Sequence, residues 1–409
     1  MNDWREVTLD ELGRVERGRS RHRPRNDPRL YGGSTPFFQT GDVKAAVLHL
    51  TEATQYYSEA GLAQSRLWQP GTTCVTIAAN IAETAVLGVP GCFPDSVLGF
   101  SPHSDPADAY FVKYLLDVER KRLSAAARGT TQENLSLEKL GKHQFRVPTP
   151  AVRRVIVRVL RALDDLIENN GRRIALLERL AQAIYREWFV HFRYPGHEDD
   201  ELVDSPLGPI PAGWEVQPLK DLASIVMGQS PKSEHYNAAG DGLPFHQGVS
   251  NFGSNYPRHR LYCRIDGRMA QAGDHLVSVR APVGRLNRAD QRLVIGRGLA
   301  AVRSRGGYQA LLGRQLGEVF HEDDVMGGGT IFKAITKGDL EGVQIVRPAD
   351  GVGRLAEAVL EPIDSLIRGL TFGERALEGL RDRLLPKLVT GAIDVSHLDL
   401  DGLLEAPAA

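Results

Sequence analysis

Cysteine is scarce in this chain of 409 residues, which has only three, Cys74, Cys92 and Cys263. They lie far apart, form no CxxC pair and lack the spacing of zinc ligands. An odd number of isolated thiols argues against a disulfide framework and is typical of reduced, buried cysteines in a cytosolic protein. We therefore expect a cytoplasmic location and no metal site.

Long apolar runs are also missing. No stretch of the sequence approaches the roughly 18 consecutive apolar residues that identify a membrane-spanning helix. The first residues, MNDWREVTLDEL, are polar and lack the apolar segment of a signal peptide. We expect no association with a membrane.

Neither sign of charge dominates. The chain has 50 basic and 51 acidic residues and a formal net charge of -1, which excludes a histone-like polycation but not local basic patches. Its apolar content of 42% is sufficient for real hydrophobic cores. The length fits two or three domains.

The common catalytic motifs are absent from the sequence. There is no Walker loop, no HExxH and no serine elbow. There is also no NPPY-like or DPPY-like tetrapeptide, which an amino-methyltransferase would need, and no glycine-rich loop placed to bind a methyl donor. The segment VMGGGT at 325–330 lacks the lysine of a phosphate loop, and Asp323–Asp324 is interpreted as a loop. We expect no catalytic residue and no cofactor in this chain.

The second half of the sequence repeats the first. LDELGRVERGRS at 9–20 aligns with LKDLASIVMGQS at 219–230, an offset of 210. PFFQ at 36–39 aligns with PFHQ at 244–247, and residues 69–80 align with 271–282. From Gly129 onward the offset is 200, so that LRALDDLI at 160–167 aligns with LEPIDSLI at 360–367. The pattern predicts two copies of one α+β unit, a mixed globular part followed by a long helical part.

The globular parts are rich in β-branched residues and are punctuated by Gly and Pro, which predicts mostly β-structure in a twisted sheet. A short helix is expected near residues 108–123, before Gly129. The turns GTTQENLS at 129–136 and GTIFKAIT at 329–336 either hold a phosphate through their amides or are plain turns.

Apolar residues recur every three or four positions from Val152 to Ile184, which predicts one long helix that starts near Pro150 and, if unbroken, reaches Phe192. The weak helix formers at 169–171 are a candidate kink. The second copy contains Pro362 and is less regular. So narrow an apolar stripe requires a partner helix, and we expect the two helices to form an antiparallel, pseudo-twofold coiled coil with one globular unit at each end. The alternative is an ordinary two-helix core. The positions predicted to bind a partner are Leu163, Ile174, Leu177, Leu180, Ile184, Leu366, Leu377, Leu380 and Leu384.

Basic residues gather where the repeated units have loops. Residues 17–29 contain six arginines and one acid, and the second unit has scattered arginines among amide and aromatic side chains. Arg and Gln can contact base edges with two hydrogen bonds, while contacts to phosphate supply affinity. The residues predicted to contact DNA are Arg17, Arg19, Ser20, Arg21, Arg23, Gln39, Thr40, Ser230, Lys232, Gln247, Arg258, Arg260, Arg280 and Arg297. The alternatives are a solvated loop for 17–29 and strand caps for Gln39 and Gln247.

Four segments together carry a resemblance to a known family. They are GTTQENLSLEKLGKHQFRVP at 129–148, LDDLIENNGRRIALLERLAQAIYREWF at 163–189, SPLGPIPAGWEVQPLKDL at 205–222 and LRDRLLPKLVTGAID at 380–394. In order and duplicated, they make the whole chain resemble the specificity subunit of type I restriction–modification systems. One departure is that Arg153–Arg154 stand where the family often has Glu-Gln.

The resemblance implies a noncatalytic subunit that places two target recognition domains on the halves of a bipartite DNA site. It also implies two modification subunits, which grip the helices and methylate adenine N6 with S-adenosylmethionine, and a restriction subunit that joins for cleavage. The implied order is a first target recognition domain at 1–148, a central conserved helical region at 149–195, a linker at 196–213, a second target recognition domain at 214–348, a C-terminal conserved helical region at 349–395 and a tail at 396–409. Two alternatives from other classes are an autonomous DNA-binding regulator without methyltransferase partners and a self-contained modification enzyme.

Overall fold

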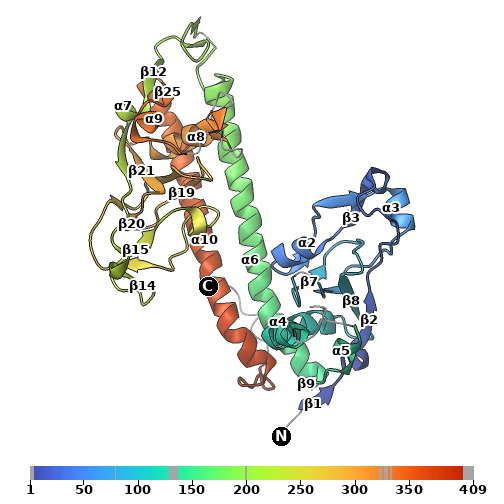
Figure 1. Cartoon of the computed structure of the whole chain (residues 1–409). Helices are drawn as coiled ribbons and strands as arrows, with labels where there is room; N and C mark the ends of the chain where they lie inside the picture. Colours follow the sequence, from blue (N-terminus) through green and yellow to red (C-terminus); the bar gives the residue numbers. More distant parts are fainter. Residues whose placement is uncertain are drawn as a thin grey trace. The chain divides into compact units, whose positions relative to one another are not determined.

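A computed structural model describes residues 4–78, 80–128, 137–198, 200–321, 325–326, 330–331 and 334–398 (Figure 1). The chain forms two compact units. The first consists of Met1–Asn170 and Gly373–Ala409, and the second of Gly171–Phe372. We call residues 1–148 and 214–348 the first and second module. The predicted turn at 129–136, Asp323–Asp324 and the glycines at 327–329 lie outside the described residues.

The first module is built on a five-stranded sheet. Its strands, in spatial order, are β2 (Gly13–Arg17), β8 (Val97–Pro102), β6 (Thr73–Thr76), β7 (Thr84–Leu87) and β4 (His49–Leu50). β6 and β7 are buried along their whole length because helix α4 (Ala107–Arg128) covers them. α4 was predicted from the sequence, and it contributes the fully buried Phe111, Val112 and Leu116 to the core.

The second module has a four-stranded sheet of the same order, together with a second sheet. The first consists of β13 (Ala223–Met227), β21 (Leu299–Ser304), β18 (His275–Ser278) and β19 (Leu286–Arg288), with α8 (Gln309–Val319) as the counterpart of α4. The second consists of β14 (Tyr236–Asn237), β16 (Tyr262–Cys263), β15 (Leu243–His246), β20 (Leu293–Ile295) and β17 (Met269–Ala270).

Strand register confirms the predicted repeat. Gly13 pairs with Pro102 and Ala223 with Ser304, so the partners are displaced by 210 (223 − 13) and 202 (304 − 102). Likewise β1 (Trp4–Val7) pairs with β9 (Phe145–Pro148), and β12 (Glu215–Pro218) pairs with β25 (Gln344–Arg347). These displacements match the offsets of the sequence alignment, so the alignment reflects a repeated backbone.

Short elements complete the two modules and the segment between them. In the first they are α1 (Leu9–Leu12), η1 (Pro28–Leu30), β3 (Tyr31–Phe37), α2 (Thr40–Ala45), β5 (Gln55–Tyr57), α3 (Glu59–Ala63) and α5 (Leu137–Lys142). Those after the first long helix are β10 (Leu202–Val203), β11 (Ile210–Pro211), α7 (Leu219–Leu222), η3 (Ser233–His235), η4 (Val249–Asn251), β22 (Phe320–His321), β23 (Val325–Met326), β24 (Thr330–Ile331) and α9 (Lys337–Glu341). All three cysteines are buried free thiols, and burial raises the pKa of Cys74.

The two long helices are α6 (Pro150–Tyr185) and α10 (Asp350–Val389). α6 starts at the predicted proline and is not interrupted at residues 169–171, but it ends before Phe192 in a π-helical turn, η2 (Arg186–Val190). α10 remains helical through Pro362. Among the described residues, no helix combines the length and apolar character needed to cross a bilayer.

The helices pack in opposite directions, as predicted. In the first unit, Ile156 near the start of α6 shares a core with Leu388 near the end of α10. In the second unit, Tyr185 at the end of α6 shares a core with Ala356 near the start of α10. Because the start of α6 meets the end of α10 and the end of α6 meets the start of α10, the two helices are antiparallel.

One buried and one exposed ion pair attach α6 to the first module. Arg153, at the departure from the family pattern, donates from Nε and Nη2 to Asp108 at 2.6 and 3.0 Å, and both residues are 4% exposed. Arg154 pairs with Asp105 at 2.9 Å. The two arginines therefore fix the start of α6 to the start of α4.

A buried aspartate recurs in both copies, 200 residues apart. Asp164 is fully buried and accepts hydrogen bonds from the Tyr114 hydroxyl at 2.7 Å and from Arg381 Nη1 at 3.0 Å. Burial, together with this carboxylate, raises the pKa of Tyr114. Its counterpart Asp364 pairs instead with Arg288 and Arg314. The acid is duplicated while its partners differ.

Candidate DNA and partner interfaces

The arginines of the loop at 17–29 differ in what they contact. Arg17 and Arg21 are exposed, and their guanidinium groups form neither a hydrogen bond nor an ion pair with any described residue. Arg19 donates to the Ser65 carbonyl at 2.9 and 2.5 Å, and Arg23 donates to the Ser20 carbonyl at 2.8 Å. Arg17 and Arg21 are therefore the cations of this loop that are best placed to meet a phosphate.

The rest of the loop is held by acids. Arg25 pairs with Asp95 at 2.7 Å and Arg29 with Asp27 at 2.7 Å. Hydrogen bonds from Arg29 hold the pKa of Asp27 well below its usual range. These pairs fold the loop onto the module, and it is more structured than a solvated basic run.

Gln39 and Thr40 lie at the start of helix α2. Gln39 is the N-cap of α2, where its backbone amide donates to Asp42 Oδ2 at 2.7 Å, and Thr40 is the first residue of that helix. Gln39 Nε2 donates to Gln55 Oε1 at 2.7 Å. Ser20 is buried at 6% exposure and takes a long hydrogen bond of 3.4 Å from the Tyr57 hydroxyl. Ser20 supports the loop from inside.

In the second module, three predicted residues meet at one place, which we call the Ser230 cluster (Ser230, Gln247 and Arg297). Ser230 Oγ donates to Gln247 Oε1 at 2.8 Å and accepts from the Arg297 backbone amide at 3.3 Å. The Gln247 and Arg297 side chains are exposed. Lys232, also exposed, follows two residues after Ser230, and a concavity of about 490 Å³ lined by Ser230 and Arg268 lies next to the cluster.

Arg258 and Arg260 are exposed and flank His259, which belongs to a buried hydrogen-bonded chain. His246 Nε2 lies 3.0 Å from His259 Nδ1, and His259 Nε2 lies 3.0 Å from Asp290 Oδ2. Burial lowers the pKa of His246 to about 4. Arg280 is exposed and forms a single β-bridge with Ala334; among the described residues, no hydrogen bond or ion pair joins it to the Ser230 cluster.

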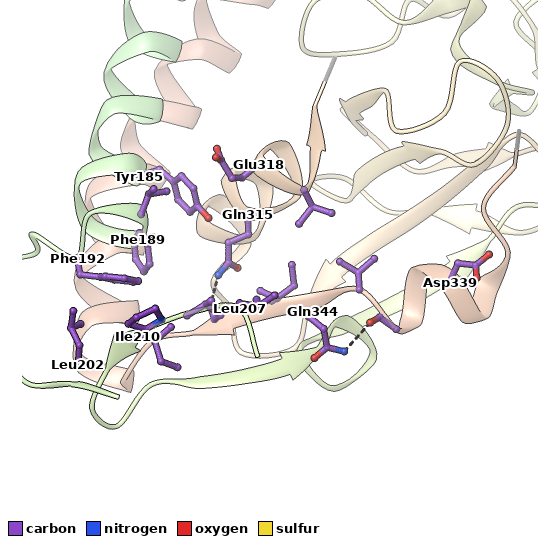
Figure 2. Close-up of a pocket in the computed structure, with 17 residues that line it drawn as sticks. Tyr185, Phe189, Phe192, Leu202, Leu207, Ile210, Gln315, Glu318, Asp339 and Gln344 are labelled. Carbon is purple, nitrogen blue, oxygen red and sulfur yellow. Dashed lines mark hydrogen bonds between the residues drawn. The ribbon is translucent and has the colours of Figure 1, made fainter. Parts of the chain in front are cut away.

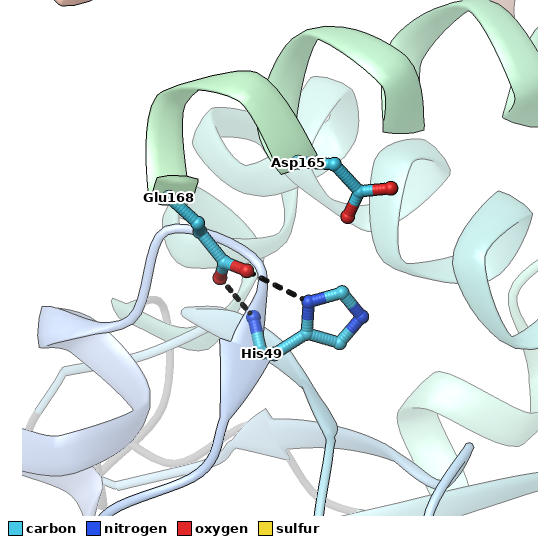
Figure 3. A group of neighbouring side chains, drawn as sticks. All are labelled: His49, Asp165 and Glu168. Carbon is cyan, nitrogen blue, oxygen red and sulfur yellow. Dashed lines mark hydrogen bonds and ion pairs between the residues drawn. The ribbon is translucent and has the colours of Figure 1, made fainter. Parts of the chain in front are cut away.

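His49, Asp165 and Glu168 are the group of potential metal ligands found among the described residues, with ligand atoms within 4.8 Å of one another. Figure 3 shows both oxygens of Glu168 directed at His49, one at the backbone amide (2.7 Å) and one at ring Nδ1 (2.9 Å). Although burial opposes it, hydrogen bonds from His49 and Leu48 hold the pKa of Glu168 below its ordinary value. Because this carboxylate is already occupied, the group is a joint between the first module and α6.

The predicted partner positions on the helices divide by exposure. Leu180 and Leu366 are 50% and 53% exposed, and Leu380 is 39% exposed. Leu163, Leu177, Ile184, Leu377 and Leu384 are half-buried. Ile174 is 6% exposed and belongs to the core of the second unit, so an intrachain contact occupies it. Two leucines that we did not select, Leu166 and Leu176, are 49% and 57% exposed.

An apolar pocket of about 860 Å³ in the second unit was not predicted from the sequence (Figure 2). Tyr185 lines it from the end of α6 and Phe189 from η2, while Leu207 and Ile210 line it from the linker and Gln315 from α8. The Gln315 side chain donates to the Val346 carbonyl at 2.7 Å. The sequence signals near this pocket were the proline-rich linker and the aromatic residues around the end of α6. Neither signal shows that these two segments line the same pocket.

Comparisons with known proteins agree with this geometry. Residues 1–179 match the family model described as the type I restriction modification DNA specificity domain. The chain is 32% identical over 309 residues to the type I restriction enzyme MjaX specificity subunit of Methanocaldococcus jannaschii, which covers 73% of this chain and 72% of that protein. It is 24% identical to the MjaIX specificity subunit of the same organism, with 97% and 95% covered.

Solved structures include one whose likeness extends over most of the fold. The crystal structure of the type I restriction–modification S subunit from M. genitalium superimposes with a TM-score of 0.61 at 15% identity, covering 94% of this chain and 96% of that one. At this identity the likeness shows the fold.

Proposed function

The chain belongs to the type I restriction–modification DNA specificity family, and from this premise we propose that its two modules read the two halves of a bipartite DNA site. The observation that carries the proposal is the repeated strand register, which gives both modules one backbone while their loops differ. Similar folds with different loop residues suit two half-sites of different sequence.

Exposed side chains support the DNA contact. Arg17 and Arg21 in the first module, and Lys232, Arg260 and Arg297 in the second, are exposed cations without a side-chain partner among the described residues. Such groups contact phosphates, which gives affinity and salt dependence without reading sequence. Gln247 provides an amide beside the cations of the second module, and amides can distinguish bases.

The partners proposed for the helices are two modification subunits. Each unit presents its own exposed leucines, Leu166 and Leu380 in the first and Leu176, Leu180 and Leu366 in the second. Exposed leucines on helices otherwise packed against each other suit a protein partner. In this proposal S-adenosylmethionine binds in the modification subunits, a restriction subunit joins for cleavage, and the complex acts on DNA in the cytoplasm.

The test is to express this chain with its modification subunit and to sequence the methylated adenines in the host DNA. The expected result is one motif with two specified halves separated by a fixed unspecified spacer. A single continuous motif, or no new methylation, would contradict the proposal. Size-exclusion chromatography with light scattering separates the regulator alternative, because it predicts a free monomer or homodimer and the proposal predicts two modification subunits per chain.

A further inference from the structure

The exposed side chain of Gln247 in the second module is held by a hydrogen bond from Ser230, and we propose that Gln247 determines specificity by recognising an adenine in one half-site. This rests on the proposed function. Gln247 directly follows β15, and its side chain is exposed. Ser230 Oγ donates to its Oε1 at 2.8 Å and accepts from the Arg297 amide at 3.3 Å. Because the backbone amide can only donate, the single hydroxyl proton of Ser230 is available for Gln247, and this hydrogen bond restrains the Gln247 amide.

Gln247 occupies space that is free because Gly296 and Gly298 have no side chain. A Cβ added to Gly296 would lie 2.8 Å from Gln247 Oε1 and 2.9 Å from its Cα. A Cβ added to Gly298 would lie 2.5 Å from the Gln247 carbonyl oxygen, which accepts the Gly298 amide at 3.1 Å. Since carbon atoms do not approach backbone atoms this closely, any side chain at either position would displace Gln247.

The backbone beneath Gln247 is anchored by the residue before it. His246 is 1% exposed and begins the chain from His246 through His259 to Asp290. His259 lies between the two, with Nδ1 3.0 Å from His246 Nε2 and Nε2 3.0 Å from Asp290 Oδ2. These contacts hold β15 against the segment that contains Arg258 and Arg260. A residue that reads bases needs such support, because its own side chain must stay near one geometry.

The chemistry of the restrained amide favours adenine. Among the described residues, Gln247 Nε2 donates to no acceptor, and Oε1 keeps a second lone pair. One donor beside one acceptor in a plane matches N7 and the N6 amino group of adenine in the major groove. An arginine such as Arg297 offers donors only and is suited to guanine or phosphate.

The aligned residue of the first module is arranged differently. Gln39 Nε2 already donates to Gln55 Oε1 at 2.7 Å, and its backbone amide caps α2. Asp95, which lies 202 residues before Arg297 as β8 lies before β21, pairs with Arg25 at 2.7 Å. The amide of the first module is therefore engaged within the protein, and we infer that adenine recognition by this glutamine is confined to the second module.

The experiment uses the full chain in complex with its modification subunit and a pool of duplexes in which both half-sites are randomised. Bound DNA is sequenced for the wild type, Gln247→Ala and Gln247→Glu. Gln247→Ala should lose preference for adenine at one position of one half-site by about 10- to 100-fold, the range of one two-pronged contact, and leave the other half-site unchanged. Gln247→Glu should move the preference toward cytosine, whose amino group donates to a carboxylate. The matched control Gln39→Ala should change neither.

The positioning part of the proposal is tested with Gly296→Ala. It should reproduce the loss seen for Gln247→Ala at the same position, with a melting temperature close to that of the wild type. A uniform loss of affinity for all sequences in Gln247→Ala would show a phosphate contact and overturn the inference, as would an unchanged motif. If the wild type itself selects no bipartite motif, the proposed function fails instead, so the two failures are distinguishable.

Discussion

Replacing Asp164 should cost the first unit more stability than replacing any other acid of α6. The carboxylate is fully buried, and Asp164→Ala leaves the Tyr114 hydroxyl without its acceptor and Arg381 without its buried partner. Each hydrogen bond to a charged group contributes about 1.5–3 kcal/mol, and breaking a buried pair costs about 3–5 kcal/mol. Because the Arg381 side chain is 21% exposed and keeps Asp382 at 2.9 Å, we expect the lower end, about 3 kcal/mol.

The neighbouring acid provides the matched control. The Asp165 side chain is 47% exposed and pairs with Arg161 at 3.4 Å one helical turn away. Such exposed pairs contribute about 0.3–0.5 kcal/mol, so Asp165→Ala should have almost no effect. Asp164→Asn keeps an acceptor for Tyr114 and should fall between the two.

The assay is urea unfolding followed by circular dichroism, with hydrogen exchange of peptides from α4 and α10 to assign the change to the first unit. Asp164→Ala should lower the unfolding free energy by about 3 kcal/mol and speed exchange in both helices. Equal stability of Asp164→Ala and Asp165→Ala would refute the reasoning, because it would show that Tyr114 and Arg381 lose nothing when their shared acceptor is removed.

Three further predictions follow from single residues. Arg21→Ala should weaken DNA binding equally for all sequences and reduce the slope of log affinity against log salt concentration by about 0.9. Arg23→Ala should change this slope less, because the Arg23 guanidinium is hydrogen-bonded within its own loop. Filter binding at several salt concentrations measures both slopes. Burial lowers the pKa of His275 to about 4, so above pH 6.5 this side chain is neutral in both the folded and the unfolded state. As pH falls from about 6.5 toward 4, only the unfolded state binds the proton, and the second unit should lose about 1.4 kcal/mol of stability per pH unit from this group. Urea titrations of His275→Leu should lack this slope, and equal slopes for the variant and the wild type would contradict the prediction. Leu180→Asp should leave the melting temperature unchanged but abolish co-elution with the modification subunit, because Leu180 is exposed. Ile174→Asp should unfold the second unit, because Ile174 is buried in its core. Normal co-elution of Leu180→Asp would show that the helix face around Leu180 does not bind the modification subunit.

The repeat and the paired helices could be predicted because they depend on periodicity and spacing. Residues such as Gly13 and Ala223 keep their strand partners at constant offsets, so the alignment carried over to three dimensions. Helical periodicity likewise identified α6, yet it could not show which leucines face α10. Leu180 and Ile174 belong to the same predicted stripe, but one is 50% and the other 6% exposed.

Side-chain contacts between residues far apart in the chain could not be predicted from the sequence. Ser230 and Gln247 were selected separately from the alignment, and nothing in a spacing of 17 residues shows that their side chains meet. The burial of Asp164 within an amphipathic helix could not be predicted, because its partners lie 50 and 217 residues away. The capping role of Gln39 depends on where the chain turns into α2, which local composition did not reveal.

The pair between Arg153 and Asp108 also limits how such proteins can be recombined. The acid belongs to the first module and the arginine to the helix, and both are almost completely buried. In a chimera joined at Pro148, a foreign module without an acid at the position of Asp108 would leave the buried Arg153 guanidinium without a partner. An unpaired buried charge of this kind costs roughly several kcal/mol of stability. A crossover placed after Arg153 would transfer acid and base together, so the natural cut for exchanging recognition modules lies inside the first turn of the helix.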